Sequence, residues 1–152
     1  MNRRLVAYLG SAAASALLVL GVVTWDRGAP PGCNPPAKPR ALAELTLKDR
    51  GVEVHGTAHY PVRLQMGTGS RGDAPVYVFP LFETGDTLGR EVRVLVMTTA
   101  PPDPLLGYED RTIRGLVRPA AGMVPEAARD ALKLQGYKLS DDTLLIAAFD
   151  EE

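Results

Sequence analysis

The strongest constraint on this chain is a segment of twenty uncharged residues near its start, Leu5 to Thr24. A helix rises about 1.5 Å per residue, so this segment would span roughly 30 Å, the thickness of the hydrocarbon core of a bilayer. Arg3 and Arg4 precede it, and Trp25 follows it at the position expected for a membrane interface. The sequence therefore predicts a single transmembrane helix over residues 5–25.

The flanking charges predict the orientation of this helix. Basic residues beside a membrane helix stay in the cytoplasm, so residues 1–4 are expected there. The remainder of the chain would be periplasmic, on a single-pass protein of a bacterial inner membrane. A cleaved secretory signal is an alternative, but its apolar core is usually about 7–15 residues long. A lipoprotein signal fits poorly, because Pro30-Pro31-Gly32 precedes Cys33 instead of an apolar-small-small box.

Small residues gather in the first half of the predicted helix. Gly10 and Ala14, and likewise Ser11 and Ser15, are small residues four positions apart. Such pairs let two helix backbones approach closely, which favours packing against another membrane helix. Alanine is also a good helix former, so the run is compatible with a helix that packs on nothing.

A proline-rich linker follows over residues 26–40. Five prolines in the thirteen residues from Gly28 to Arg40 exclude a helix and favour an extended polyproline spacer of about 40 Å. Cys33 is the only cysteine of the chain, so it cannot form an internal disulfide. It is either a solvated thiol or takes part in an intermolecular disulfide or a metal contact.

The remaining residues, 41–152, form an acidic domain. They hold twelve basic and seventeen acidic residues, which gives a net charge of −5. An acidic domain repels phosphate backbones, so nucleic acid is not expected to be its partner.

Alternating apolar residues predict short strands in this domain. The expected strands cover residues 51–56, 76–79, 92–96, 112–117 and 143–146, and residues 41–48 and 62–66 add two candidates. Pro125-Glu126 opens one helix, which Gln135-Gly136 ends. We therefore expect a mainly β domain, as a small antiparallel barrel of the oligonucleotide/oligosaccharide-binding (OB) type with one helix. A β-sandwich is the alternative.

Two of the expected strands contain a glycine. Gly56 and Gly115 each lie inside a strand, with a proline a few residues later. A glycine within a strand often marks a bulge or a bend at a barrel corner, so both residues are expected at such corners.

The order of these landmarks resembles the extramembrane domain of the Surfeit-locus family of cytochrome oxidase assembly factors. The matching pieces span about residues 50–119 and are Val54-His-Gly56, Val76-Tyr-Val-Phe-Pro80-Leu81, Val94-Leu-Val96, Pro101-Pro102 and Ile113-Arg-Gly115. The resemblance implies an accessory or assembly factor that binds proteins, in contact with a respiratory complex, and no enzyme.

This chain departs from the family at two points. Met97-Thr98-Thr99 stands where the family has Arg-Gly-Trp, which argues against a role with haem. The family's second membrane helix has no counterpart before the acidic end of the sequence, Asp150-Glu151-Glu152.

Few residues suggest chemistry. His55 and His59, the only histidines, would face one side of a strand with Cα atoms about 13 Å apart, too far to share a metal. We expect surface or rim histidines, no catalytic residues and no cofactor. Tyr77 and Phe79 are expected in the core. The alternative function is a periplasmic module that binds a metal, haem or a glycan.

Overall fold

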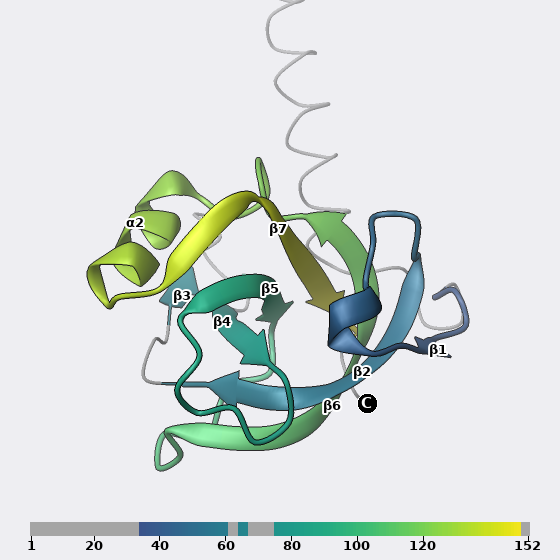
Figure 1. Ribbon diagram of the computed structural model, residues 1–152, viewed down its shortest axis with the longest axis horizontal. Helices are drawn as coiled ribbons and strands as arrows, with labels where there is room; N and C mark the ends of the chain where they lie inside the picture. The colour runs from purple at the N-terminus through teal and green to yellow at the C-terminus, as the bar shows by residue number, and fades with distance from the viewer. Residues whose placement is uncertain (1–33, 61–63, 67–74, 150–152) are drawn as a thin grey trace, which may run out of the picture. The chain divides into compact units, whose positions relative to one another are not determined.

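The computed structural model describes residues 34–60, 64–66 and 75–149 (Figure 1). The predicted membrane helix, its small residues Gly10, Ser11, Ala14 and Ser15, and Cys33 lie outside the described residues. Within the described part, no helix has the length and apolar character needed to cross a bilayer. The contacts divide the chain after Asn34, and the fold below is that of the unit that begins at Pro35.

The unit is mainly β with a single α-helix among the described residues, as predicted. Its elements in chain order are β1 (Lys38–Pro39), the 3-10 helix η1 (Leu42–Glu44), β2 (Gly51–His59), β3 (Leu64–Met66), β4 (Val76–Phe82), β5 (Glu91–Thr98), β6 (Tyr108–Pro119), α2 (Glu126–Leu134) and β7 (Lys138–Ala148).

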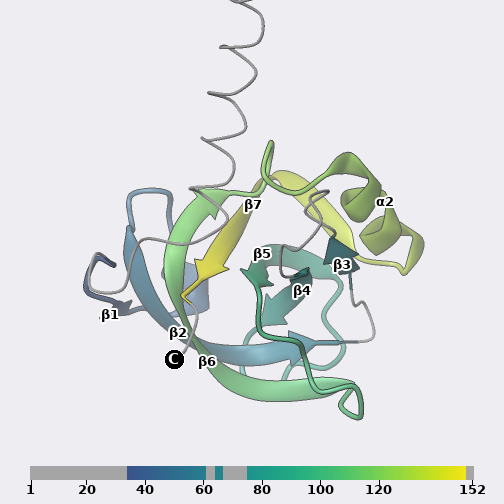
Figure 2. The same ribbon diagram turned by 180° about the vertical axis from the view of Figure 1, so that it is seen from behind.

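The sheet closes on itself. Its strands follow the order β1-β2-β6-β7-β5-β4-β3, and β2 also pairs with β4 through Thr57 opposite Phe82 and Ala58 opposite Leu81. The strands β2, β6, β7, β5 and β4 therefore form a ring, which both ribbon views show as a curved wall (Figures 1 and 2). Closure satisfies backbone groups that an open sheet would leave at its edges.

The expectation of an antiparallel barrel is wrong for one of the five strand pairs of the ring. Strands β5 and β7 run parallel, with Val94 to Met97 opposite Leu144 to Ala147. The reason is topological: directions cannot alternate all the way round a ring of five strands, so at least one neighbouring pair must be parallel. The short β1, from within the predicted linker, also pairs in parallel with β2.

Two apolar clusters lie on opposite faces of the wall. The inner cluster contains Val54, Phe79, Val96 and Ile146, among others, and the outer cluster places α2 on the wall through residues that include Val78, Leu95, Leu132 and Leu145. Strands β4, β5 and β7 contribute to both clusters. This double burial explains why residues 76–79 are apolar on both faces and confirms that β4 is an internal strand.

The core prediction for β4 is half right. Phe79 is buried inside the ring, whereas Tyr77 is only partly buried. Tyr77 pairs with Gln65 of β3 and Thr98 of β5.

Helix α2 begins and ends as predicted. Pro125 precedes its first residue, and Gly136 follows with φ of +90°, a left-handed conformation that ends helices. Ala128 and Leu132 of this helix are buried, whereas Leu134 is exposed.

The strand predicted over residues 41–48 is wrong, because this segment forms η1 and a turn. The Asp49 carboxylate accepts hydrogen bonds from the Thr46 backbone N–H at 2.9 Å and from the Thr46 hydroxyl at 3.2 Å. Side-chain bonds to the local backbone compete with strand pairing. For the strand predicted over 62–66, the described part forms β3.

Gly56 and Gly115 mark close approaches of neighbouring segments. A Cβ atom on Gly56 would lie 2.4 Å from the Phe82 carbonyl oxygen, and one on Gly115 would lie 2.3 Å from the Ala147 carbonyl oxygen. The β2–β6 register runs without a shift through both glycines, so neither glycine marks a bulge in this pairing. The register shifts instead between β5 and β7, at Val92 to Val94.

Candidate functional site

The two histidines of β2 have different environments. His55 is exposed, and its Nδ1 lies 3.1 Å from the Thr112 hydroxyl. His59 is 0% exposed, so the expectation of a surface or rim residue is wrong for it. His55 and His59 are four residues apart on β2 and therefore face the same side of the strand. At His59, that side is covered by segments that are distant in sequence.

Hydrogen bonds define the tautomer of His59. Its Nε2–H donates to the Asp86 carbonyl oxygen at 2.7 Å, because a carbonyl can only accept. Its Nδ1 accepts from the Tyr137 hydroxyl at 3.1 Å. Burial lowers the pKa of His59, with a smaller contribution from the Arg90 charge, while the hydrogen bond to Asp86 opposes this shift. His59 is therefore a neutral imidazole whose two nitrogens are both used.

Aromatic rings enclose this imidazole. The Phe82 ring lies 4.2 Å from it between centroids, and the Tyr108 ring lies edge-on at 4.9 Å. The Tyr137 ring, at 6.0 Å, carries the Arg90 guanidinium on one face at 5.2 Å. His59 thus joins β2, β4, β6 and the segment before β7.

The β4–β5 loop, residues 83–90, is tied to the barrel around His59. The Asp86 carboxylate accepts from the backbone N–H groups of Leu88 at 3.0 Å and Gly89 at 2.7 Å. The Gly85 N–H donates to the Thr57 hydroxyl at 2.7 Å, and that hydroxyl donates to Asp110. These bonds hold the loop in one conformation.

The β5–β6 loop, residues 99–107, is held in a similar way. The Asp103 carboxylate accepts from the Leu105 N–H at 2.9 Å, and the Gly107 carbonyl accepts from the Tyr60 N–H at 2.8 Å. The Tyr60 hydroxyl donates to Glu109 at 2.6 Å and accepts from Arg111 at 2.9 Å. Burial, reinforced by the bond to Glu109, raises the pKa of Tyr60 to about 12.

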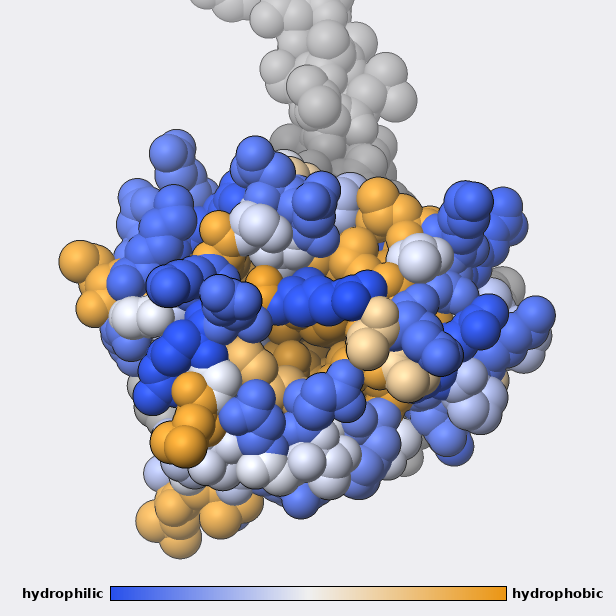
Figure 3. Space-filling view, in the orientation of Figure 1, coloured by the Kyte–Doolittle hydropathy of each residue, from blue (hydrophilic) through white to orange (hydrophobic). Residues whose placement is uncertain are grey.

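Together these two loops and Tyr108 present an exposed apolar surface, which we call the loop surface. Leu88 is 84% exposed, Leu105 is 90% exposed, and Leu106 and Tyr108 are also exposed. The loops are neighbours, because His59 contacts both the Tyr108 ring and the Asp86 carbonyl. Apolar protrusions stand out at the lower left of the space-filling view (Figure 3). Single exposed leucines are ordinary, but several on ordered neighbouring loops are typical of an interaction site.

A second feature is a groove of about 730 Å³ beside the starts of β5 and β7. Its floor includes the buried side chains of Leu45, Val92 and Leu144, and its rim is polar, with Glu91, Lys138, Asp141 and Asp142 among the lining residues. The space-filling view shows a hollow with an apolar floor on this face of the domain (Figure 3).

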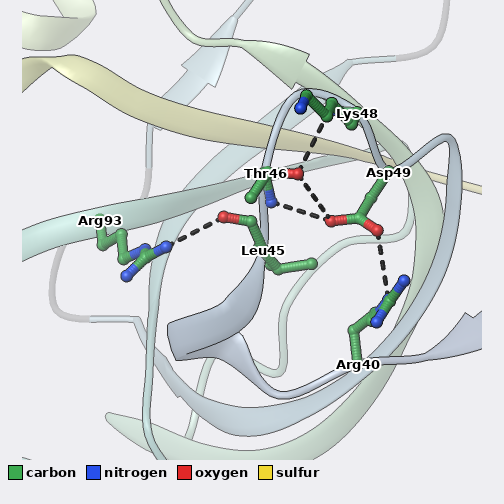
Figure 4. A network of polar contacts seen from close by, with 6 residues as sticks. All are labelled: Arg40, Leu45, Thr46, Lys48, Asp49 and Arg93. Atoms are coloured by element: carbon green, nitrogen blue, oxygen red, sulfur yellow. Dashed lines mark hydrogen bonds and ion pairs between the residues drawn. The ribbon is translucent and has the colours of Figure 1, made fainter.

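One wall of the groove is fixed by a polar network (Figure 4). Asp49 accepts from Thr46 and forms an ion pair with Arg40, whose Nε lies 3.2 Å from the carboxylate. The bond from the Thr46 backbone lowers the pKa of Asp49 more than the Arg40 charge does. Arg93 of β5 donates to the Leu45 carbonyl at 2.9 Å and so links the two sides of the groove.

Among the residues that the structure describes, neither histidine belongs to a cluster of metal-ligating side chains. Within the described ranges, no three His, Cys, Asp or Glu side chains come together in a group that could hold a metal ion. The structure also keeps the two histidines apart, one in solvent and one enclosed by rings.

Comparison with protein-family models, curated proteins and solved structures finds no match to this chain. The resemblance to the Surfeit-locus family therefore stays a prediction.

The loop surface is the feature that the sequence interpretation missed. Residues 101–104, with three prolines, have the composition of a turn, and nothing in them points to a binding surface. The sequence feature that could have revealed this surface is the pair Leu105-Leu106, directly after residues 101–104. A short proline-rich loop cannot bury both of these leucines.

Proposed function

We propose that this chain is a membrane-anchored, non-catalytic accessory protein whose periplasmic domain binds another protein through the loop surface. The ring of five strands supports an OB-like barrel, a small fold that binds its partners through strand faces and connecting loops. The uncharged segment Leu5–Thr24 supports the anchor, and the proline-rich linker would hold the domain away from the lipid.

The observation that carries this proposal is the exposure of Leu105 on an ordered loop. Its side chain is 90% exposed, although the loop is fixed by Asp103 and by the bond between Gly107 and Tyr60. Exposing a leucine to water forgoes roughly 1.5–3 kcal/mol of burial free energy. A partner that covers Leu105 would recover this free energy.

Photo-crosslinking of the full-length chain in its native membrane tests the proposal. We expect p-benzoylphenylalanine at position 105 to give a discrete protein adduct, several-fold stronger than at position 134. Leu134 is the matched control, because it is 88% exposed but lies on α2. Equal labelling at both positions, or no adduct at 105, would contradict the function.

The groove favours a second candidate function, the binding of a small ligand with an apolar body. A volume of about 730 Å³ lies in the range of ligand pockets. A ligand found in a screen should raise the Tm, and Ser140→Trp should remove that rise by filling the groove. Ser140 suits this change because it lines the groove and is exposed. A rise in Tm that survives in Ser140→Trp would place the ligand elsewhere.

A further inference from the structure

The loop surface is acidic as well as apolar. Residues 83–90 and 99–111 hold five acidic and two basic residues, a net charge of −3. Of the acidic residues, Glu83, Asp103 and Asp110 are exposed.

Both basic residues of this region are engaged within the domain. Arg90 lies over the Tyr137 ring and donates to the Gly89 carbonyl at 2.8 Å. Arg111 donates to Tyr60 and lies 3.8 Å from the Glu109 carboxylate. Both cations are therefore engaged with groups of the domain, and the net negative charge is that of residues 83–90 and 99–111 themselves.

From this arrangement we infer that the loop surface takes a basic, apolar polypeptide segment, whose apolar side chains cover Leu88 and Leu105 while its Lys or Arg side chains meet Glu83, Asp103 and Asp110. This inference rests on the proposed function and specifies the chemistry of the partner. Complementary charge around an apolar centre gives specificity and speeds association. The same negative charge disfavours an anionic lipid surface as the occupant.

Binding of two defined peptides tests the inference. The full-length chain is placed in phosphatidylcholine nanodiscs, and binding of a short labelled leucine-lysine peptide is measured by fluorescence anisotropy against empty nanodiscs. The reference is the same peptide with glutamate in place of lysine. We expect the lysine peptide to bind at least tenfold more tightly, with an affinity that falls as salt is added.

Isosteric variants show whether this binding uses the loop surface. The triple variant Glu83→Gln, Asp103→Asn, Asp110→Asn removes three charges and keeps the oxygens that accept from Leu105 and Thr57. We expect it to weaken the lysine peptide about tenfold, at roughly twofold per exposed charge. The matched variant Glu126→Gln, Asp130→Asn, Asp142→Asn makes the same change in net charge elsewhere and should stay within about twofold of the parent. Equal weakening in both variants, or equal binding of both peptides, would overturn the inference.

The apolar part is tested separately. Leu105→Ser should weaken the lysine peptide about tenfold, and Leu134→Ser should leave it unchanged. An unaffected Leu105→Ser variant would overturn the inference.

Lipid as the occupant is tested with Leu105→Trp in a Trp25→Phe background. Quenching of this tryptophan by brominated lipid in the nanodisc would assign the loop to lipid and overturn the inference. Absence of quenching agrees with a polypeptide. If neither peptide binds while the adduct at position 105 persists, the basic chemistry is wrong and the proposed function stands.

Discussion

Replacing Gly115 with alanine is expected to lower the free energy of unfolding by about 3 kcal/mol or more. A Cβ atom there would lie 2.3 Å from the Ala147 carbonyl oxygen and 2.7 Å from Ile146 Cγ2. The first contact is with backbone of β7, which pairs with β6 at this point, so the neighbour cannot turn away. Overpacking of a core costs typically about 1–3 kcal/mol and more where the obstacle is rigid. Urea unfolding of the full-length chain in detergent, followed by tyrosine fluorescence, measures the loss.

Two further variants frame this result. Gly56→Ala should behave alike, because its Cβ would lie 2.4 Å from the Phe82 carbonyl oxygen. Gly107→Ala should stay within about 0.5 kcal/mol of the parent, because nothing lies within 4 Å of its added Cβ. If Gly107→Ala costs as much as Gly115→Ala, the close approach of Ala147 would not explain the effect.

The alternation of apolar residues was enough to predict the main strands and α2. A strand buried on one face alternates, and one buried on both faces does not, so β2 and β4 could be distinguished from sequence. Gly56 and Gly115 were also recognised as special positions. The sequence could not show which neighbour approaches them, because that depends on strand pairing over long separations.

His59 shows why the site was harder to predict than the fold. The spacing along β2 correctly places His59 on the same side of the strand as His55, and at His55 this side is exposed to solvent. Burial of His59 comes from the β4–β5 loop and Tyr137, which lie 27 and 78 residues away in sequence. No local pattern encodes such a cover. In contrast, the exposure of Leu105 could have been predicted from the sequence, because this residue lies in a short proline-rich loop.

The free energy of unfolding is expected to fall between pH 6.5 and pH 5 because of His59. Burial depresses its folded-state pKa below the usual 6.5, so the unfolded chain binds a proton that the folded chain resists. Stability is therefore fully present above the unfolded pKa and is lost as the pH falls toward the folded pKa, at most about 1.4 kcal/mol per pH unit. Urea unfolding at a series of pH values measures this slope.

The charged and titratable groups around His59 leave the direction of this slope unchanged. Arg90 adds to the depression, and the Asp86 charge opposes it less strongly than burial acts. The Tyr137 hydroxyl can reverse its bond and accept from a protonated Nδ1, which limits the cost but adds no charge to pair with the cation. Burial raises the pKa of Tyr137, so this phenol stays protonated across the range.

The second histidine provides the control for this slope. His55→Gln should leave the pH dependence between 6.5 and 5 unchanged, because His55 is exposed on the same strand. His59→Gln should lower stability at neutral pH, through lost ring packing, and flatten the slope. If the free energy of unfolding still falls with pH in His59→Gln, carboxylates and not His59 would be responsible for the pH dependence. A slope that vanishes in His55→Gln would mean that burial of His59 costs nothing on protonation. Protonation at Nδ1 keeps the Nε2–H bond to the Asp86 carbonyl, so the cost arises from the buried charge and from the changed bond to Tyr137.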